Sequence, residues 1–278
     1  MVSSALTRRL SPDNSGKIYI GGTNFTNYNG TSGKFFRLNS DGSLDTGFNS
    51  GGAGFNGDTY NLGFQSNGKL IVGGAFTTYN GTSVNKLCRL NTDGSLDTSF
   101  NSGGTGPNVS LESNTVVVLK DDKIILNGTI TSYNGTAVPY ICRLNSDGSL
   151  DTSFNSGGSG FNISHTFSNI EVAPDGKLFI AGRQSMTYNG SSAYGLLRLN
   201  SDGTIDNSFS LRSIAAGDCY DCVVGLDGKV YLLGTFESYD GDPKANFFIR
   251  VNYDGSIDEE FTLGLAYYVN SINNVNGE

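Results

Sequence analysis

Short runs rich in apolar residues recur along the whole chain, and each run ends at residues that favour turns. Between residues 60 and 100, Asn-Gly, Tyr-Asn-Gly and Asp-Gly segments separate four such runs, which are Tyr60–Gln65, Lys69–Phe76, Lys86–Asn91 and Ser95–Phe100. Runs of this length bounded by such turns are typical of antiparallel strands joined by hairpins. This stretch therefore predicts four strands, and no part of the chain shows the 3.6-residue period of an amphipathic helix.

One nine-residue phrase occurs five times. It reads Arg-Leu-Asn-Ser-Asp-Gly-Ser-Leu-Asp from Arg37, and close variants begin at intervals of 52 to 55 residues, at Arg89, Arg143, Arg198 and Arg250. A repeat of this length, rich in turn glycines and β-branched residues, is typical of β-propeller blades. We therefore expect an all-β fold, namely a five-bladed β-propeller of four-stranded antiparallel blades.

The phrase also predicts its own hairpin register. A two-residue loop at Asp41-Gly42 would place Leu38 opposite a charged residue. A three-residue loop with Gly42 in the left-handed region instead pairs Leu38 with Leu44 and Arg37 with Asp45, so that like apolar groups and opposite charges meet. The same structural pairing is expected in every repeat, between Arg89 and Asp97, Arg143 and Asp151, Arg198 and Asp206, and Arg250 and Asp258.

The repeats are expected at about residues 17–59, 60–110, 111–165, 166–217 and 218–265. Segments that resemble a first strand stand at both ends of the chain, and five blades need only one of them. We expect the more apolar segment, 266–278, to close the ring by supplying Tyr268–Val275 as the inner strand of blade one, since closure leaves no open sheet edge. Residues 1–16 would then form an N-terminal arm or a surplus strand. The alternative is a longer parent chain that continues into a sixth blade at Glu278.

The composition bears on location and partners. Hydrophobic residues make up 37% of the chain and charged residues only 16%, and there are 39 glycines. Asn, Ser, Thr and Gly must then cover much of the surface, which suggests an extracellular or virion surface. The net charge is −8, which argues against a nucleic-acid partner because phosphate binding needs basic residues. We also expect no membrane insertion, since no apolar run has membrane-spanning length, and the first residues lack the apolar core of a signal peptide.

The motif from Asn67 to Phe100 resembles the delta-60 repeat. It reads Asn-Gly-Lys-Leu-Ile-Val-Gly-Gly-Ala-Phe, then Tyr-Asn-Gly, then Arg-Leu-Asn-Thr-Asp-Gly-Ser-Leu-Asp-Thr-Ser-Phe. The resemblance covers about residues 17 to 265, with small departures such as Met186 at the place of Phe76. The delta-60 repeat is a β-propeller blade of bacterial surface and phage proteins, and the resemblance implies no enzymatic activity and no catalytic residues.

A row of tyrosines is the candidate ligand-binding feature. In a four-stranded meander the loops from strand two to strand three share a face with the Gly-rich connections between blades, such as Ser50–Phe55 and Ser156–Phe161. Tyrosine with Asn, Ser and Gly suits adaptable recognition, including recognition of sugars. The alternative is that the tyrosines wedge between blades above Asn-Gly turns, and their solvent exposure distinguishes the two. The residues are Tyr28, Tyr79, Tyr133, Tyr188 and Tyr239.

Other chemistry has weaker support, and we expect no cofactor, no metal and no catalytic residue. Asn39, Asp41, Ser43 and Asp45 alternate as calcium ligands do, but the hairpin already uses them and the glycine spacing is not that of a calcium loop. The four cysteines are expected as small buried residues. His165 is the single histidine and lies in a connection between repeats. Paired-carboxylate hydrolysis by Asp218 and Asp221 remains an alternative.

These features favour a non-catalytic structural or recognition module. The first expectation is a phage virion protein, associated with the tail or capsid, made in the host cytoplasm and working in an oligomeric assembly with other virion or surface proteins. The alternatives are a domain of a secreted bacterial adhesin that binds cell-surface glycans, and a glycan-active enzyme that uses the central channel.

Overall fold

The computed structural model describes residues 6–13, 15–111, 115–162, 169–183, 185–209, 214–242 and 247–261. Strands and turns make up this part of the chain, and it contains no helix. It divides into a first unit of Met1–Val138 and Cys142–Asp151 and a second unit of Pro139–Ile141 and Thr152–Glu278. The all-β class predicted from the strand and turn pattern is confirmed.

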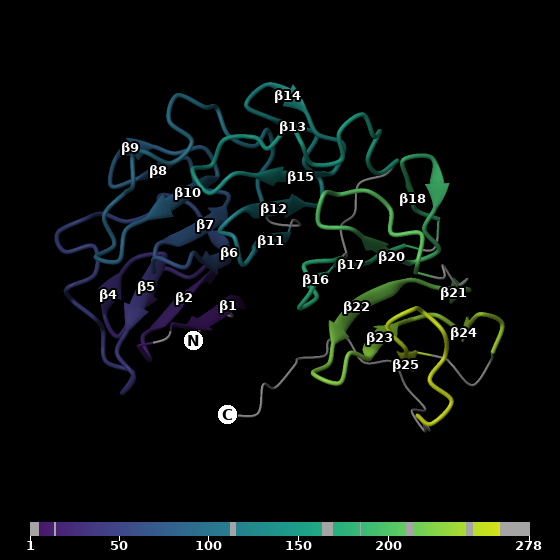
Figure 1. Cartoon of the computed structure of the whole chain (residues 1–278). Helices are drawn as coiled ribbons and strands as arrows, with labels where there is room; N and C mark the ends of the chain where they lie inside the picture. Colours follow the sequence, from purple (N-terminus) through teal and green to yellow (C-terminus); the bar gives the residue numbers. More distant parts are fainter. Residues whose placement is uncertain are drawn as a thin grey trace. The chain divides into compact units, whose positions relative to one another are not determined.

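Three antiparallel sheets of three strands belong to the first three repeats, coloured purple to teal in Figure 1. Their strand orders are β1-β2-β5, β6-β7-β10 and β11-β12-β15. In chain order the strands are β1 (Leu6–Pro12), β2 (Ile18–Thr23), β5 (Phe35–Leu38), β6 (Thr59–Phe64), β7 (Leu70–Gly74), β10 (Leu87–Leu90), β11 (Thr115–Val118), β12 (Ile124–Asn127) and β15 (Ile141–Leu144).

Two further three-stranded sheets belong to the last two repeats, coloured green to yellow in Figure 1. The fourth repeat contains β16 (Ile170–Val172), β17 (Leu178–Ala181) and β20 (Leu196–Leu199). The fifth contains β22 (Cys219–Val224), β23 (Val230–Gly234) and β25 (Phe248–Val251).

Each loop between the second and third strands holds a two-residue strand that ends in the candidate tyrosine. In the first four repeats this short strand pairs with the next one as a small hairpin, and in the fifth β21 pairs with β24. The elements are β3 (Asn27–Tyr28), β4 (Thr31–Ser32), β8 (Thr78–Tyr79), β9 (Thr82–Ser83), β13 (Ser132–Tyr133), β14 (Thr136–Ala137), β18 (Thr187–Tyr188), β19 (Ser191–Ser192), β21 (Ile214–Ala215) and β24 (Ser238–Tyr239).

The predicted hairpin register is confirmed. Leu38 bridges Leu44, and the Asn39 amide donates to the Ser43 carbonyl at 2.8 Å across a three-residue loop. Gly42 closes this loop with φ of 81°, a conformation that favours glycine. The corresponding bridges in the other repeats are Leu90–Leu96, Leu144–Leu150, Leu199–Ile205 and Val251–Ile257.

The expected fourth strand of each blade consists only of the one β-bridge that follows the Asp-Gly hairpin, such as Leu90–Leu96. In the second repeat, the predicted strand Ser95–Phe100 pairs only at Leu96. The Asp97 carboxylate accepts the Ser99 amide at 3.0 Å, and the Phe100 amide donates to the Asp97 carbonyl at 3.2 Å. These local bonds turn the chain away from the sheet, because an Asp side chain that binds the backbone two residues later competes with ladder pairing.

The first sheet corrects the assignment of the chain ends. β1 pairs with β2 from Leu6 opposite Thr23 to Pro12 opposite Ile18. The other edge of β2 pairs with β5. Because a strand has only two edges, no place beside β2 remains for 268–275, and the expectation of closure there is wrong. Residues 6–12 form a strand of this sheet rather than an arm, and residues 262–278 lie outside the described part of the chain.

The core of each unit consists of the middle strands and the aromatic residues of the turns. All five residues of β7 are buried, and so are all four of β12 and β17. Such continuous burial matches the apolar runs in the sequence, because the middle strand of a stacked sheet is covered on both faces. Among the described residues no helix has the length and apolar character needed to span a lipid bilayer.

Candidate functional site

The predicted tyrosine recognition face is not available for binding. Tyr79, Tyr133, Tyr188 and Tyr239 are at most 1% exposed. Burial raises the pKa of the first three of these hydroxyls. Each hydroxyl donates at 2.6 to 2.8 Å to the carbonyl of the Asp-Gly turn in its own repeat, and the acceptors are Gly94, Gly148, Gly203 and Gly255.

Tyr28 follows the same pattern with a half-buried ring, and its hydroxyl donates to the Gly42 carbonyl at 2.7 Å. The ligand-binding hypothesis is therefore wrong for the four buried tyrosines, and each of the five tyrosines joins two loops of one repeat. The loop arrangement behind the hypothesis is present. Phe55 of a Gly-rich connection bridges Tyr79, and the Gly54 amide donates to the Asn80 side chain at 2.7 Å.

Removing one of these hydroxyls is expected to lower stability modestly. Tyr133→Phe deletes the buried bond to the Gly148 carbonyl and should lower the free energy of unfolding by about 1–2 kcal/mol, because the carbonyl then loses its partner away from water. Tyr28→Phe is the matched control and should cost less, since water can reach its half-buried site. Urea titrations monitored by circular dichroism measure both. Equal losses of unfolding free energy in the two variants would contradict the idea that burial makes the Tyr133 hydrogen bond the more stabilising one.

The predicted Arg–Asp pairs form in all five repeats. The arginine Nε lies 2.7 to 2.9 Å from the aspartate Oδ2 in Arg37–Asp45, Arg89–Asp97, Arg143–Asp151, Arg198–Asp206 and Arg250–Asp258. Burial opposes ionisation of Asp97 and Asp206, but hydrogen bonds from a lysine and a serine outweigh it and hold the pKa of both carboxyls well below its usual range.

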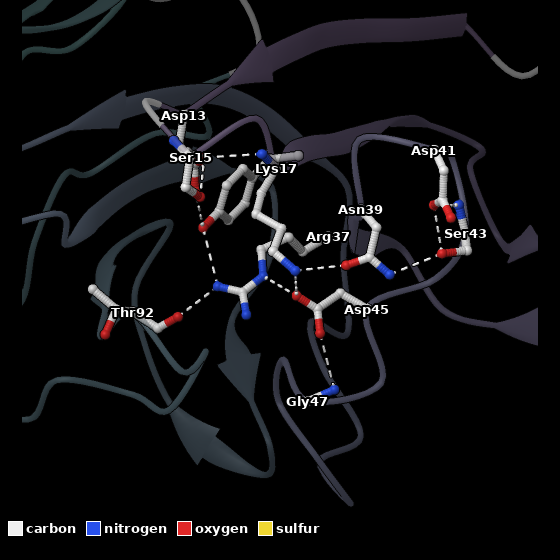
Figure 2. A network of polar contacts seen from close by, with 11 residues as sticks. Asp13, Ser15, Lys17, Arg37, Asn39, Asp41, Ser43, Asp45, Gly47 and Thr92 are labelled. Atoms are coloured by element: carbon white, nitrogen blue, oxygen red, sulfur yellow. Dashed lines mark hydrogen bonds and ion pairs between the residues drawn. The ribbon is translucent and has the colours of Figure 1, made fainter.

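A lysine that the sequence reasoning missed completes each of these pairs. Its ammonium lies 2.6 to 3.3 Å from the same Oδ2, as Figure 2 shows for Lys17, Arg37 and Asp45. The signal was present, because a lysine ends the first turn of every repeat. These lysines are Lys17, Lys69, Lys123, Lys177 and Lys229.

The alternating oxygens of the first hairpin serve the hairpin itself. Asp41 accepts the Ser43 amide at 2.9 Å and the Ser43 hydroxyl at 2.6 Å, while Asn39 bonds Ser43 and Lys17 (Figure 2). Across the described ranges, no three His, Cys, Asp or Glu side chains gather as a metal site requires.

All four cysteines are free thiols in the core. Burial raises the pKa of Cys142 and Cys219 to about 12, and it raises that of Cys88 and Cys222 as well. A thiol held protonated and out of reach of solvent is a poor nucleophile.

Glu171 is a carboxylate neighbour of Asp221 that the sequence did not indicate. Asp221 is buried and accepts the Asn169 side-chain amide at 2.5 Å. Burial, assisted by the charge of Asp221, raises the pKa of Glu171 on β16. Asp218 lies before β22, and its backbone amide donates to the Thr235 hydroxyl at 3.3 Å. Glu171 was missed because it follows an apolar residue in a strand without any motif. His165 lies outside the described residues.

A cavity of about 740 Å³ in the first unit is a candidate binding site. The turns after β1, β6 and β11 surround it, together with the Asp-Gly hairpin of the second repeat. Its walls combine apolar groups with both signs of charge. The residues are Asp13, Ser15, Lys17, Tyr19, Arg37, Phe64, Gln65, Ser66, Gly68, Thr92, Val118, Leu119, Lys120 and Asp122.

The groups at the cavity wall are held in place by hydrogen bonds. Arg37 donates from Nη1 to the Thr92 carbonyl at 2.6 Å (Figure 2). The same nitrogen donates to the Tyr19 hydroxyl at 3.3 Å. Asp122 accepts the Ser66 amide and hydroxyl, both at 2.6 Å. Fixed polar groups beside an apolar floor are typical of small-ligand pockets. Sequence reasoning missed this cavity because its walls come from three different repeats.

The five repeats coincide with a known family. The domain of unknown function (DUF5122) beta-propeller matches the chain five times, at residues 14–48, 65–100, 119–154, 173–209 and 226–261. The chain belongs to this β-propeller family. The matched segments of the family cover more than half of the chain, and each contains one copy of the nine-residue phrase.

Solved structures with a similar fold are distant. A protein of unknown function from Bacteroides caccae is 11% identical, with a TM-score of 0.46 over 92% of this chain and 81% of that one. A calcium-binding regucalcin from Agrobacterium tumefaciens is 13% identical (0.45; 91% and 73%), and a gluconolactonase from Xanthomonas campestris is 16% identical (0.44; 83% and 69%). The comparison with curated proteins finds no match. Similarity at this level does not extend to activity or ligand, because one fold hosts many functions.

Proposed function

We propose that this family member is a non-catalytic structural and recognition module that binds its partner at the cavity of the first unit. One observation carries the proposal. The cavity of about 740 Å³ is lined by groups from three repeats, and hydrogen bonds hold Arg37, Ser66 and Asp122 in place beside the apolar side chains of Phe64 and Val118. Among the described residues that line the cavity there is no histidine and no cysteine.

We place the module on a bacteriophage virion, in contact with other virion proteins or with the host surface, and we identify its units with delta-60 repeats. The low charged fraction of 16% and the 39 glycines support a surface covered by short polar side chains. The net charge of −8 supports a protein partner rather than a nucleic acid. A secreted bacterial surface protein is the alternative location.

Immunogold labelling tests this placement. Antibody raised against the purified protein should label intact phage particles in lysates of the cells that produce the protein naturally. Labelling of bacterial cells without labelling of particles would move the protein to the bacterial surface. Glycan hydrolysis that disappears in both Glu171→Gln and Asp221→Asn variants would contradict the non-catalytic assignment.

A further inference from the structure

The fifth repeat shows what can occupy the space beside a repeat arginine. Tyr253 lies in the Asp-Gly hairpin of that repeat, and its ring centroid is 4.7 Å from the guanidinium carbon of Arg198. The Tyr253 hydroxyl donates to Asp175 Oδ1 at 2.7 Å, and its backbone carbonyl accepts a hydrogen bond from Arg198 Nη1. The phenolic ring thus stacks on the arginine, and its hydroxyl donates a hydrogen bond to an acceptor in the first turn of the fourth repeat.

The same place in the first unit is open. Thr92 stands where Tyr253 stands in the motif, and its carbonyl likewise accepts from Arg37 Nη1. The backbone arrangement is therefore retained, while the ring is replaced by a small side chain. Arg37, Thr92 and Ser15, which corresponds to Asp175, all line the cavity of about 740 Å³. This volume lies within the range of about 300–1,000 Å³ common for ligand pockets.

Arg37 also keeps a donor that other repeat arginines use internally. In the second and fourth repeats Nη2 donates to a serine hydroxyl, from Arg89 to Ser99 at 3.3 Å and from Arg198 to Ser208 at 2.9 Å. The first repeat has Gly47 at this position. The hydrogen bonds of Arg37 within the described part of the chain come from Nε and Nη1 alone. Its Nη2 is therefore available to an occupant of the cavity.

Hydrogen-bond acceptors also line the cavity. Asp13 Oδ2 has one long contact, 3.4 Å from the Tyr19 hydroxyl, so it can accept a further hydrogen bond. Phe64 and Val118 add apolar wall. The charges of the cavity and its immediate neighbour Asp45 cancel, with three cations and three anions, which favours an uncharged ligand. These are Lys17, Arg37 and Lys120 against Asp13, Asp45 and Asp122.

We propose that this cavity binds the phenolic side chain of a tyrosine presented by a partner protein. The ring stacks on Arg37 as Tyr253 stacks on Arg198, and its hydroxyl donates to Asp13 or Ser15. Guanidinium groups favour aromatic faces through the ring quadrupole, and a sugar ring offers no such face. The proposal rests on the recognition role proposed above and names the chemistry of the partner.

Binding of N-acetyl-L-tyrosinamide to the full chain, measured by ligand-observed NMR titration, tests the proposal. The wild-type protein should bind it, and N-acetyl-L-phenylalaninamide should bind about fivefold more weakly because it lacks the hydroxyl. Thr92→Tyr supplies the ring internally and should weaken binding at least about tenfold. Ser40→Tyr, at the matching position of the first repeat's turn, is the control and should leave binding unchanged.

Gly47→Ser provides a second variant that is compatible with the fold, since serine occupies this position in other repeats. It should engage Nη2 and weaken binding severalfold. Binding that is unchanged in both Thr92→Tyr and Gly47→Ser, or tighter binding of methyl glucoside than of the tyrosine amide, would overturn the proposal. Immunogold labelling of particles without tyrosine binding would refute the ligand and leave the proposed function intact. Tyrosine binding without labelling of any particle or cell would support the proposed ligand and refute the proposed placement on a virion or bacterial surface.

Discussion

Replacement of Arg198 by methionine is expected to lower the free energy of unfolding by about 3 to 5 kcal/mol, the usual cost of removing one partner of a buried ion pair. The Arg198 side chain is 3% exposed and that of Asp206 is 7% exposed. The variant leaves Asp206 with Lys177, whose side chain is 27% exposed. It also loses the bonds from Arg198 to Ser208 and to the Tyr253 carbonyl. Urea unfolding at constant m-value measures the loss.

Two further variants make this expectation specific. Arg37→Met removes the same pair at a site with 14% exposure, and it should cost less because solvent can reach the remaining carboxylate. The double variant Arg198→Met with Asp206→Leu should recover part of the loss, since it also removes the buried carboxylate that has lost its arginine and keeps only the more exposed Lys177 as a cationic partner. A loss below about 1 kcal/mol for Arg198→Met would show that the pair is no more than a surface ion pair.

Gly74→Ala is expected to cost about 3 kcal/mol, near the upper end of overpacking effects. Gly74 ends β7 opposite Thr59, where the register with β6 shifts. This irregularity brings backbone against backbone, and an added Cβ would lie 2.2 Å from the Asp58 carbonyl oxygen. That oxygen also accepts the Ala75 amide at 2.9 Å, so it cannot retreat without losing a hydrogen bond.

The adjacent glycine provides the control for this prediction. An added Cβ on Gly73 would lie 2.9 Å from Leu111 Cδ1 and 3.2 Å from Val116 Cγ2. Both contacts are with side-chain ends, which can shift, so Gly73→Ala should cost only about 1 kcal/mol. Similar midpoints for the two variants in urea would show that backbone crowding does not set the requirement for Gly74.

The fold class and the hairpins could be predicted because their signals are local and repeated. Arg37 and Asp45 are only eight positions apart, and a three-residue loop that pairs Leu38 with Leu44 brings their side chains together. All five copies of the phrase are compatible with the same hairpin register, which supports it more strongly than one copy would. The lysines of the ion-pair network were predictable in the same way, since Lys17 and its counterparts stand at one fixed place in the repeat.

The tyrosines illustrate a signal that has two structural meanings. A Tyr-Asn-Gly loop suits an exposed recognition surface and also suits a buried ring above a tight turn. The outcome depends on the carbonyl that the hydroxyl reaches, such as Gly148 for Tyr133, and that acceptor lies in another loop of the repeat. The fourth strand was overestimated for a related reason, because Asp97 binds Ser99 and ends the pairing after one residue.

The sequence by itself determined the all-β class, the five repeats, the loop of each Asp-Gly hairpin and the partner of each repeat arginine, since these depend on spacing within a few residues. The tertiary structure alone decided that β1 takes the free edge of β2, that the tyrosines are buried, and that a cavity opens beside Arg37. These features depend on which distant segments meet. Thr92 occupies the position that Tyr253 has in the fifth repeat, and nothing in the neighbouring sequence indicates the space that the smaller side chain leaves.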